Sequence, residues 1–90
     1  MGRSNNDTYK EMMYLNNMAS DYADAGQYDK AIGIYKNCIL VNEKNKWTDR
    51  LIRNYNGLFE AFEKKGDYRH AFEYLKAFYL LNDSLRGQDI

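Results

Sequence analysis

The sequence predicts an all-α protein built from two helical hairpins. Three observations support this prediction: the 90 residues contain no proline, apolar residues recur at steps of three and four, and one six-residue pattern occurs twice, 40 residues apart. Steps of three and four place apolar side chains on one face of a helix, so no strand is expected. Four helices are expected, with consecutive helices antiparallel, at roughly residues 7–25, 28–43, 47–65 and 67–85.

The first helix of each hairpin is marked by an apolar series that ends at a glycine. The two series are Met12, Leu15, Met18/Ala19, Tyr22 and Leu51/Ile52, Tyr55, Leu58/Phe59, Phe62. Gly26 and Gly66 follow them, and glycine readily adopts the left-handed conformation that closes a helix. A tight turn is therefore expected at each glycine. Asp67 can cap the following helix through its carboxylate, whereas Gln27 is a poorer cap, so the first hairpin should fray more easily.

The second helix of each hairpin begins with the repeated pattern. Its two copies are Gly26-Gln27-Tyr28-Asp29-Lys30-Ala31 and Gly66-Asp67-Tyr68-Arg69-His70-Ala71. The same offset carries Tyr22 onto Phe62, so the apolar pattern repeats with the turn. We expect Ala31 to pack against Tyr22 and Ala71 against Phe62, because small and large side chains interlock. The chain is predicted to be a single domain, residues 1–90, with a first repeat at about 8–45, a second at about 46–85 and a short tail at 86–90.

These motifs resemble the tetratricopeptide repeat. The matching residues are Leu15-x-x-Met18-Ala19-x-x-Tyr22 with Gly26-x-Tyr28-x-x-Ala31-x-x-x-Tyr35, and Tyr55-x-x-Leu58-Phe59-x-x-Phe62 with Gly66-Asp67-Tyr68-x-x-Ala71-x-x-x-Leu75. The resemblance covers about residues 8–85 and implies a right-handed α-solenoid that binds other proteins. Glu43 and Asp83 replace the family's usual proline, Phe59 stands where a small residue is common, and the period is 40 instead of about 34. Long-period units of this kind look like those of bacterial sensor and transcriptional-regulator proteins, so the chain is expected to be either a fragment of such a regulator or a complete small protein.

Composition and spacing argue against several other functions. Lys plus Arg and Asp plus Glu number 13 each, without long blocks of one sign, so neither nucleic acid nor a membrane surface is an expected partner. No segment is apolar enough for a membrane span, and a cytoplasmic location is expected. The lone His70 is not paired by spacing with Cys38, which should be a buried thiol, so we expect no enzyme activity and no cofactor. Asp21 and Asp24 alone lack the ligand count of a metal site.

The resemblance also implies where a partner would bind, because the concave surface of this family is formed by the first helix of each hairpin. Two equivalent rows of residues are candidates for a peptide groove: Met13, Asn16, Ser20 and Asp24 in the first hairpin, and Arg53, Asn56, Glu60 and Lys64 in the second. Asn16 and Asn56 coincide under the 40-residue offset, and an amide can donate to and accept from a peptide backbone. An ordinary solvated helix surface has the same pattern, so two interpretations of these rows stay open: a peptide groove and a surface without a binding role.

Self-association is the alternative function. Residues 71–81 are as apolar as residues 31–41, which should lie sandwiched between two helices, yet only Ser84 to Ile90 follow. The outer side of the last helix therefore needs cover, either from a symmetric dimer or from neighbouring repeats of a longer parent. Phe72, Leu75 and Tyr79 are the candidate contact residues for self-association.

Two further groups of side chains have open interpretations. Trp47 is expected either to pack at the joint between the hairpins or to stand exposed as a contact residue. The group of Met12, Met13 and Met18 is expected either to fill the core or to form an adaptable binding surface.

Overall fold

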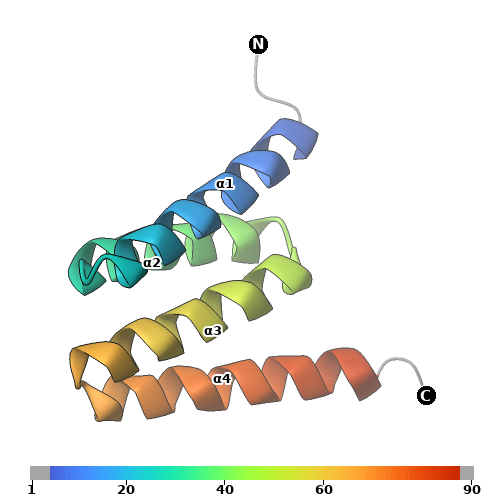
Figure 1. Ribbon diagram of the computed structural model, residues 1–90. Helices are drawn as coiled ribbons and strands as arrows, with labels where there is room; N and C mark the ends of the chain where they lie inside the picture. The colour runs from blue at the N-terminus through green and yellow to red at the C-terminus, as the bar shows by residue number, and fades with distance from the viewer. Residues whose placement is uncertain (1–4, 88–90) are drawn as a thin grey trace.

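Four helices follow one another along the chain in the computed structural model, which describes the backbone of residues 5–87 and the side chains of residues 6–83. They are α1 (Asn5–Asp24), α2 (Tyr28–Lys44), α3 (Thr48–Lys65) and α4 (Tyr68–Gly87), and consecutive helices run antiparallel (Figure 1). No strand occurs within residues 5–87, so the all-α prediction is confirmed. Every helix begins and ends within about two residues of its expected position. Of the predicted tail, residues 86 and 87 belong to α4, and residues 88–90 lie outside the described part.

The hairpin turns have the predicted glycine geometry. Gly26 and Gly66 have φ angles of 82° and 91°, in the left-handed region. In each turn the amide after the glycine donates to the carbonyl five residues back, at 2.8 and 2.9 Å. The turn between α2 and α3 differs, because Lys46 takes a left-handed φ of 58° without being glycine. There the side-chain amide of Asn45 donates to the Val41 carbonyl at 2.9 Å, which satisfies one carbonyl of the helix end.

The core lies where the two hairpins meet. Its buried apolar residues are Ala19, Ala31, Ile32, Tyr35, Leu58, Ala61, Phe62 and Ala71. Both repeat alanines belong to this cluster together with Phe62, and Tyr22 packs against it, as the interlocking of small and large residues predicts. The Phe62 ring stacks on Tyr74 at 5.6 Å between ring centroids, which ties α3 to α4.

The helices form a flat array. The Cα atoms extend over 40 × 37 × 16 Å, and α2 packs against both α1 and α3, as expected. α1 also contacts α3, whereas α4 packs against α3 alone among the described helices. This order is compatible with the predicted solenoid. It leaves one side of α4 open: Phe72 and Tyr79 are 62% and 56% exposed, and Leu75 is half-buried.

The remaining sequence interpretations are resolved residue by residue. Trp47 packs at the joint between the hairpins, where its ring meets that of Tyr9 edge to face at 5.1 Å. Cys38 is completely buried, as predicted, and burial raises the pKa of its thiol. The methionines do not act as one group, because Met12 is buried in the core whereas Met13 is 41% exposed.

Candidate protein-binding surface

The two predicted rows of residues lie on neighbouring helices, because α1 packs beside α3. We call the surface they form the α1/α3 face; its residues are Met13, Asn16, Ser20, Asp24, Arg53, Asn56, Glu60 and Lys64. At one end of this face the Lys64 ammonium lies 3.8 Å from the Asp24 carboxylate. Both side chains are exposed, so the pair contributes little to stability but places opposite charges side by side across the two helices.

Tyr35 of α2 reaches between α1 and α3 to this face. Its ring fills the space where a side chain at Gly57 would lie: a Cβ there would be 2.6 Å from both Cε1 and the hydroxyl oxygen of Tyr35. Burial raises the pKa of the Tyr35 hydroxyl first, the charge of Glu60 raises it further, and a hydrogen bond with Ser20 opposes the shift. A phenol therefore stands between residues of both predicted rows.

A chain of hydrogen-bonded asparagine amides runs from the interior to the α1/α3 face. The Asn42 amide of α2 donates to Asn54 of α3 at 2.6 Å, and Asn54 donates to the Asn16 carbonyl oxygen of α1 at 3.1 Å. Asn42 and Asn54 are almost completely buried, and Asn16 is half-buried. Asn16 is therefore not a freely solvated side chain, because its oxygen accepts a hydrogen bond from a buried neighbour. Asn56, the equivalent position, is exposed.

At the other end of the face, the candidate side chains are exposed. Met13 and Arg53 are exposed, one on each helix. Seven of the eight candidate side chains are exposed, so a partner segment can contact them. The exception is Asn16, which is half-buried.

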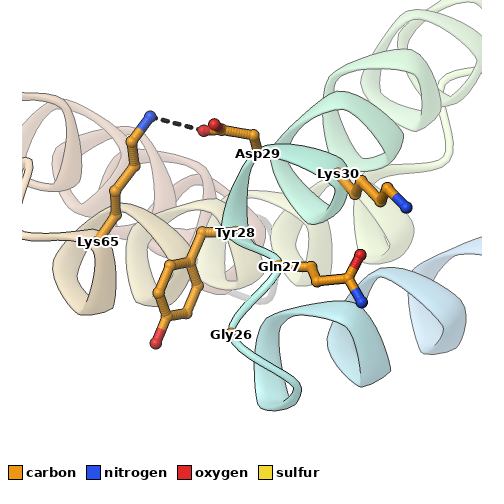
Figure 2. Close-up of a pocket in the computed structure, with 6 residues that line it drawn as sticks. All are labelled: Gly26, Gln27, Tyr28, Asp29, Lys30 and Lys65. Atoms are coloured by element: carbon orange, nitrogen blue, oxygen red, sulfur yellow. Dashed lines mark hydrogen bonds and ion pairs between the residues drawn. The ribbon is translucent and has the colours of Figure 1, made fainter.

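The hairpin turns carry a second group of charges. Lys65, at the end of α3, donates to the Asp29 carboxylate at 2.6 Å and links the two hairpins (Figure 2). This hydrogen bond raises the pKa of Lys65. The pair borders a shallow pocket of about 240 Å³ that also includes Gly26, Gln27, Tyr28 and Lys30. This volume is below the roughly 300–1,000 Å³ usual for small-molecule sites.

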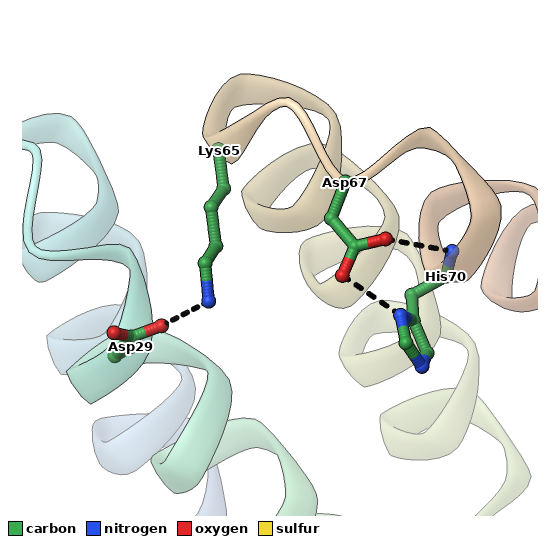
Figure 3. A network of polar contacts seen from close by, with 4 residues as sticks. All are labelled: Asp29, Lys65, Asp67 and His70. Carbon is green, nitrogen blue, oxygen red and sulfur yellow. Dashed lines mark hydrogen bonds and ion pairs between the residues drawn. The ribbon is translucent and has the colours of Figure 1, made fainter.

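The start of α4 explains the environment of the lone histidine. The Asp67 carboxylate accepts from the His70 backbone amide at 3.3 Å and contacts the His70 ring nitrogen at 2.8 Å (Figure 3). Asp67 therefore caps α4 as predicted, whereas Gln27 makes no side-chain cap to α2. The hydrogen bond with the His70 ring holds the pKa of Asp67 below its ordinary value. His70 therefore takes part in the cap at the start of α4.

A third cluster joins the start of α1 to the start of α3. The Tyr9 hydroxyl donates to the Asp49 carboxylate, and this bond is the main reason that the pKa of Tyr9 is raised. The guanidinium of Arg50 lies over the Tyr9 ring at 5.5 Å. Arg50 is only 8% exposed, and its buried Nε has no hydrogen-bond partner among the described atoms. Together with Trp47, these residues hold the two hairpins together at the end opposite the glycine turns.

Sequence reasoning missed the residues that lie between the helices. Asn42, Asn54 and Arg50 were not singled out, because polar residues at helical positions are usually exposed. Gly57 carried a usable signal, since a glycine inside an apolar helical series indicates a close approach of another group. Within the described residues, no three His, Cys, Asp or Glu side chains are grouped so that they could hold a metal ion.

Comparisons with known proteins give one similarity. The chain is 35% identical over 69 residues to heat shock protein sti1 homolog of Schizosaccharomyces pombe. The matched segment is 76% of this chain but 12% of that protein, so the chain spans a small part of the relative's length. This similarity and the four-helix arrangement are compatible with a tetratricopeptide-type fold.

The other comparisons found nothing. No family model matches the chain, and no solved structure matches it. Among the described residues, no helix has both the length and the apolar character needed to cross a membrane.

Proposed function

We propose that this chain is a non-catalytic, tetratricopeptide-type module that binds a segment of another protein on its α1/α3 face. The observation that carries the proposal is the packing of α1 beside α3, which brings Asp24 of one predicted row within 3.8 Å of Lys64 of the other. Equivalent positions of the two repeats thereby lie side by side on neighbouring helices. The similarity to heat shock protein sti1 homolog supports a protein-interaction role of this kind.

The charges of the face define the kind of partner segment. Asp24 and Lys64 form one pair of opposite charges, and Glu60 and Arg53 supply another two charges on α3. Asn56 is exposed and can donate to and accept from a peptide backbone at once. We therefore expect an extended segment with charges of both signs, held mainly by hydrogen bonds.

Selection from a random peptide library displayed on phage, followed by calorimetric titration of the selected peptides, tests this function. Asn56→Ala should weaken binding by about 1–3 kcal/mol, because a hydrogen bond at the interface is lost. Asn37→Ala, at an exposed position of α2, is the matched control and should bind as the wild type does. Selected peptides that bind the Asn56→Ala and Lys64→Ala variants unchanged would show that the α1/α3 face is not the binding surface.

Self-association is a second candidate function. The observation that favours it is the exposure of Phe72 and Tyr79 on the open side of α4, since large apolar side chains that share one exposed helix face often mark an interface. A symmetric dimer through α4 and the packing of neighbouring repeats are two ways to cover this side.

A further inference from the structure

The joint between the two hairpins can be compared with the outer faces of α1 and α4, because these faces carry equivalent residues. Because the sequence repeats every 40 residues, a residue of α2 that packs in this joint has its equivalent on α4. A residue of α3 that packs in the joint likewise has its equivalent on α1. The outer face of α4 and the outer face of α1 therefore carry the residues equivalent to the two sides of this joint.

The outer face of α4 repeats the buried surface of α2. Ile32 and Tyr35 lie in the core cluster with side chains of α3, at 8% and 4% exposure. Ile39, one turn further along α2, packs against the same cluster. Their equivalents on α4 are Phe72, Leu75 and Tyr79, of which Phe72 and Tyr79 are exposed and Leu75 is half-buried.

The outer face of α1 repeats the buried surface of α3. Asn54, Gly57 and Leu58 are buried where α3 receives α2. Their equivalents on α1 are Tyr14, Asn17 and Met18, of which Tyr14 is 71% exposed, Asn17 is exposed and Met18 is half-buried. A pocket of about 270 Å³ is lined by these three residues and Asp21.

At the centre of the joint, one pair of positions exchanges a large and a small side chain between its two sides. In the joint within the chain, the large Tyr35 ring occupies the space left by Gly57. If a second copy packed in the same way, the smaller Leu75 would face the larger Asn17 of that copy. At this pair the size difference would be exchanged between the two sides, so the contact would need no change of register.

The charges are complementary too. The Tyr9–Asp49 hydrogen bond and the Asp24–Lys64 ion pair each join residues 40 positions apart. If a second copy followed the first in the same register, each residue of α3 would lie beside the equivalent residue of the second copy's α1. Lys64 of one copy would therefore meet Asp24 of a second copy, and Asp49 would meet Tyr9.

A cation and an aromatic ring recur in the same way. Lys36 of α2 lies over the Phe62 ring of α3 at 5.9 Å. The equivalent residues are Lys76 of α4 and Tyr22 of α1, again a lysine and an aromatic ring.

We propose that a second copy of this chain docks head to tail, with the outer face of α4 against the outer face of the next copy's α1. The contact continues the array of helices and repeats the register of the internal joint. It goes beyond the proposed peptide binding, because the contacting surfaces are the outer faces of α1 and α4. It also differs from a symmetric dimer, because α4 meets α1 and not a second α4, so assembly continues past two copies.

Two double variants test this geometry by sedimentation velocity over a concentration series. Phe72→Glu with Tyr79→Glu blocks the α4 face, and Tyr14→Glu with Asn17→Glu blocks the α1 face; all four side chains are exposed, so the folded chain should tolerate the changes. The wild type should form species larger than a dimer as concentration rises. Each double variant alone should stay monomeric, and an equimolar mixture of the two should form a dimer and nothing larger.

Several outcomes would overturn the proposal. A wild type that stays monomeric throughout the series excludes it, as does a mixture of the two variants that stays monomeric although circular dichroism shows both folded. If the variant blocked at α1 still dimerises alone, α4 pairs symmetrically with itself. Asn37→Glu, at an exposed position of α2, is the control and should assemble as the wild type does.

Discussion

Asn54 links three helices through one side chain, because it accepts from Asn42 and donates to Asn16. Asn54→Ala should lower the free energy of unfolding by about 1–3 kcal/mol, since it leaves two amide groups beneath the surface without their partner. Urea titration measures this change. Asn56→Ala, exposed on the same helix, is the matched control and should shift stability by less than about 0.5 kcal/mol. Equal effects of the two substitutions would show that the amide chain adds no stability.

Gly57 is required by the Tyr35 ring and not by a turn. Gly57→Ala should destabilise the protein by about 1–3 kcal/mol, although alanine is the better helix former by about 1 kcal/mol, because the new Cβ overlaps the ring. Tyr35→Leu removes the clash, so the double variant should be more stable than the sum of the single changes predicts. Strict additivity, measured by thermal unfolding, would contradict the contact.

Single residues differ in how far their sequence context determines them. Gly26 and Gly66 could be assigned their left-handed conformation in advance, because a helix end between two apolar series is a local signal. The burial of Asn42 and Asn54 could not, because it depends on which helix faces which and not on neighbours in sequence. The same limit explains why Asn16 and Asn56, which are equivalent under the offset, have different environments.

At the scale of helices, the cap of α4 makes stability depend on pH. The His70 hydrogen bond holds the pKa of Asp67 below 3.8, its ordinary value, so the ionised carboxylate is favoured in the folded chain. The stabilisation is complete above that ordinary value and is lost as the pH falls through the lower, folded value. Asp67→Asn caps the helix without titrating in this range, so its melting temperature should fall less on acidification than that of the wild type. Parallel curves for the two proteins would contradict this role.

Helix ends were predictable to the extent that local chemistry sets them. At the two glycine turns, the expected helix ends agree with the structure to within one residue. The turn at Lys46 has no such signal, since a left-handed lysine is held there by the surrounding contacts. Trp47 and its partner Tyr9 lie 38 positions apart in sequence, so the expected packing at the joint named one ring but not the other.

At the scale of the molecule, the two hairpins should unfold as one unit, because α3 contacts both α1 and α2 and the core cluster crosses the joint. Trp47, the only tryptophan, reports on the joint, and far-ultraviolet circular dichroism reports on all four helices. The two signals should give the same urea midpoint. A fluorescence change that precedes the loss of helix would show that the hairpins separate before they unfold.

The rate at which Cys38 reacts with a thiol reagent measures how often the core opens. Cys38 is the single thiol of the chain, and it lies on α2 with no exposed surface. Burial raises the pKa of this thiol, which disfavours the reactive thiolate. A thiol-specific reagent can therefore react with Cys38 only after α2 has moved away from its neighbours. Without denaturant, the labelling rate relative to an unfolded peptide therefore gives the fraction of molecules open at any moment. If this fraction equals the globally unfolded fraction from urea, the first hairpin never opens by itself. A larger fraction would show that its uncapped turn lets α2 detach while α3 and α4 stay folded.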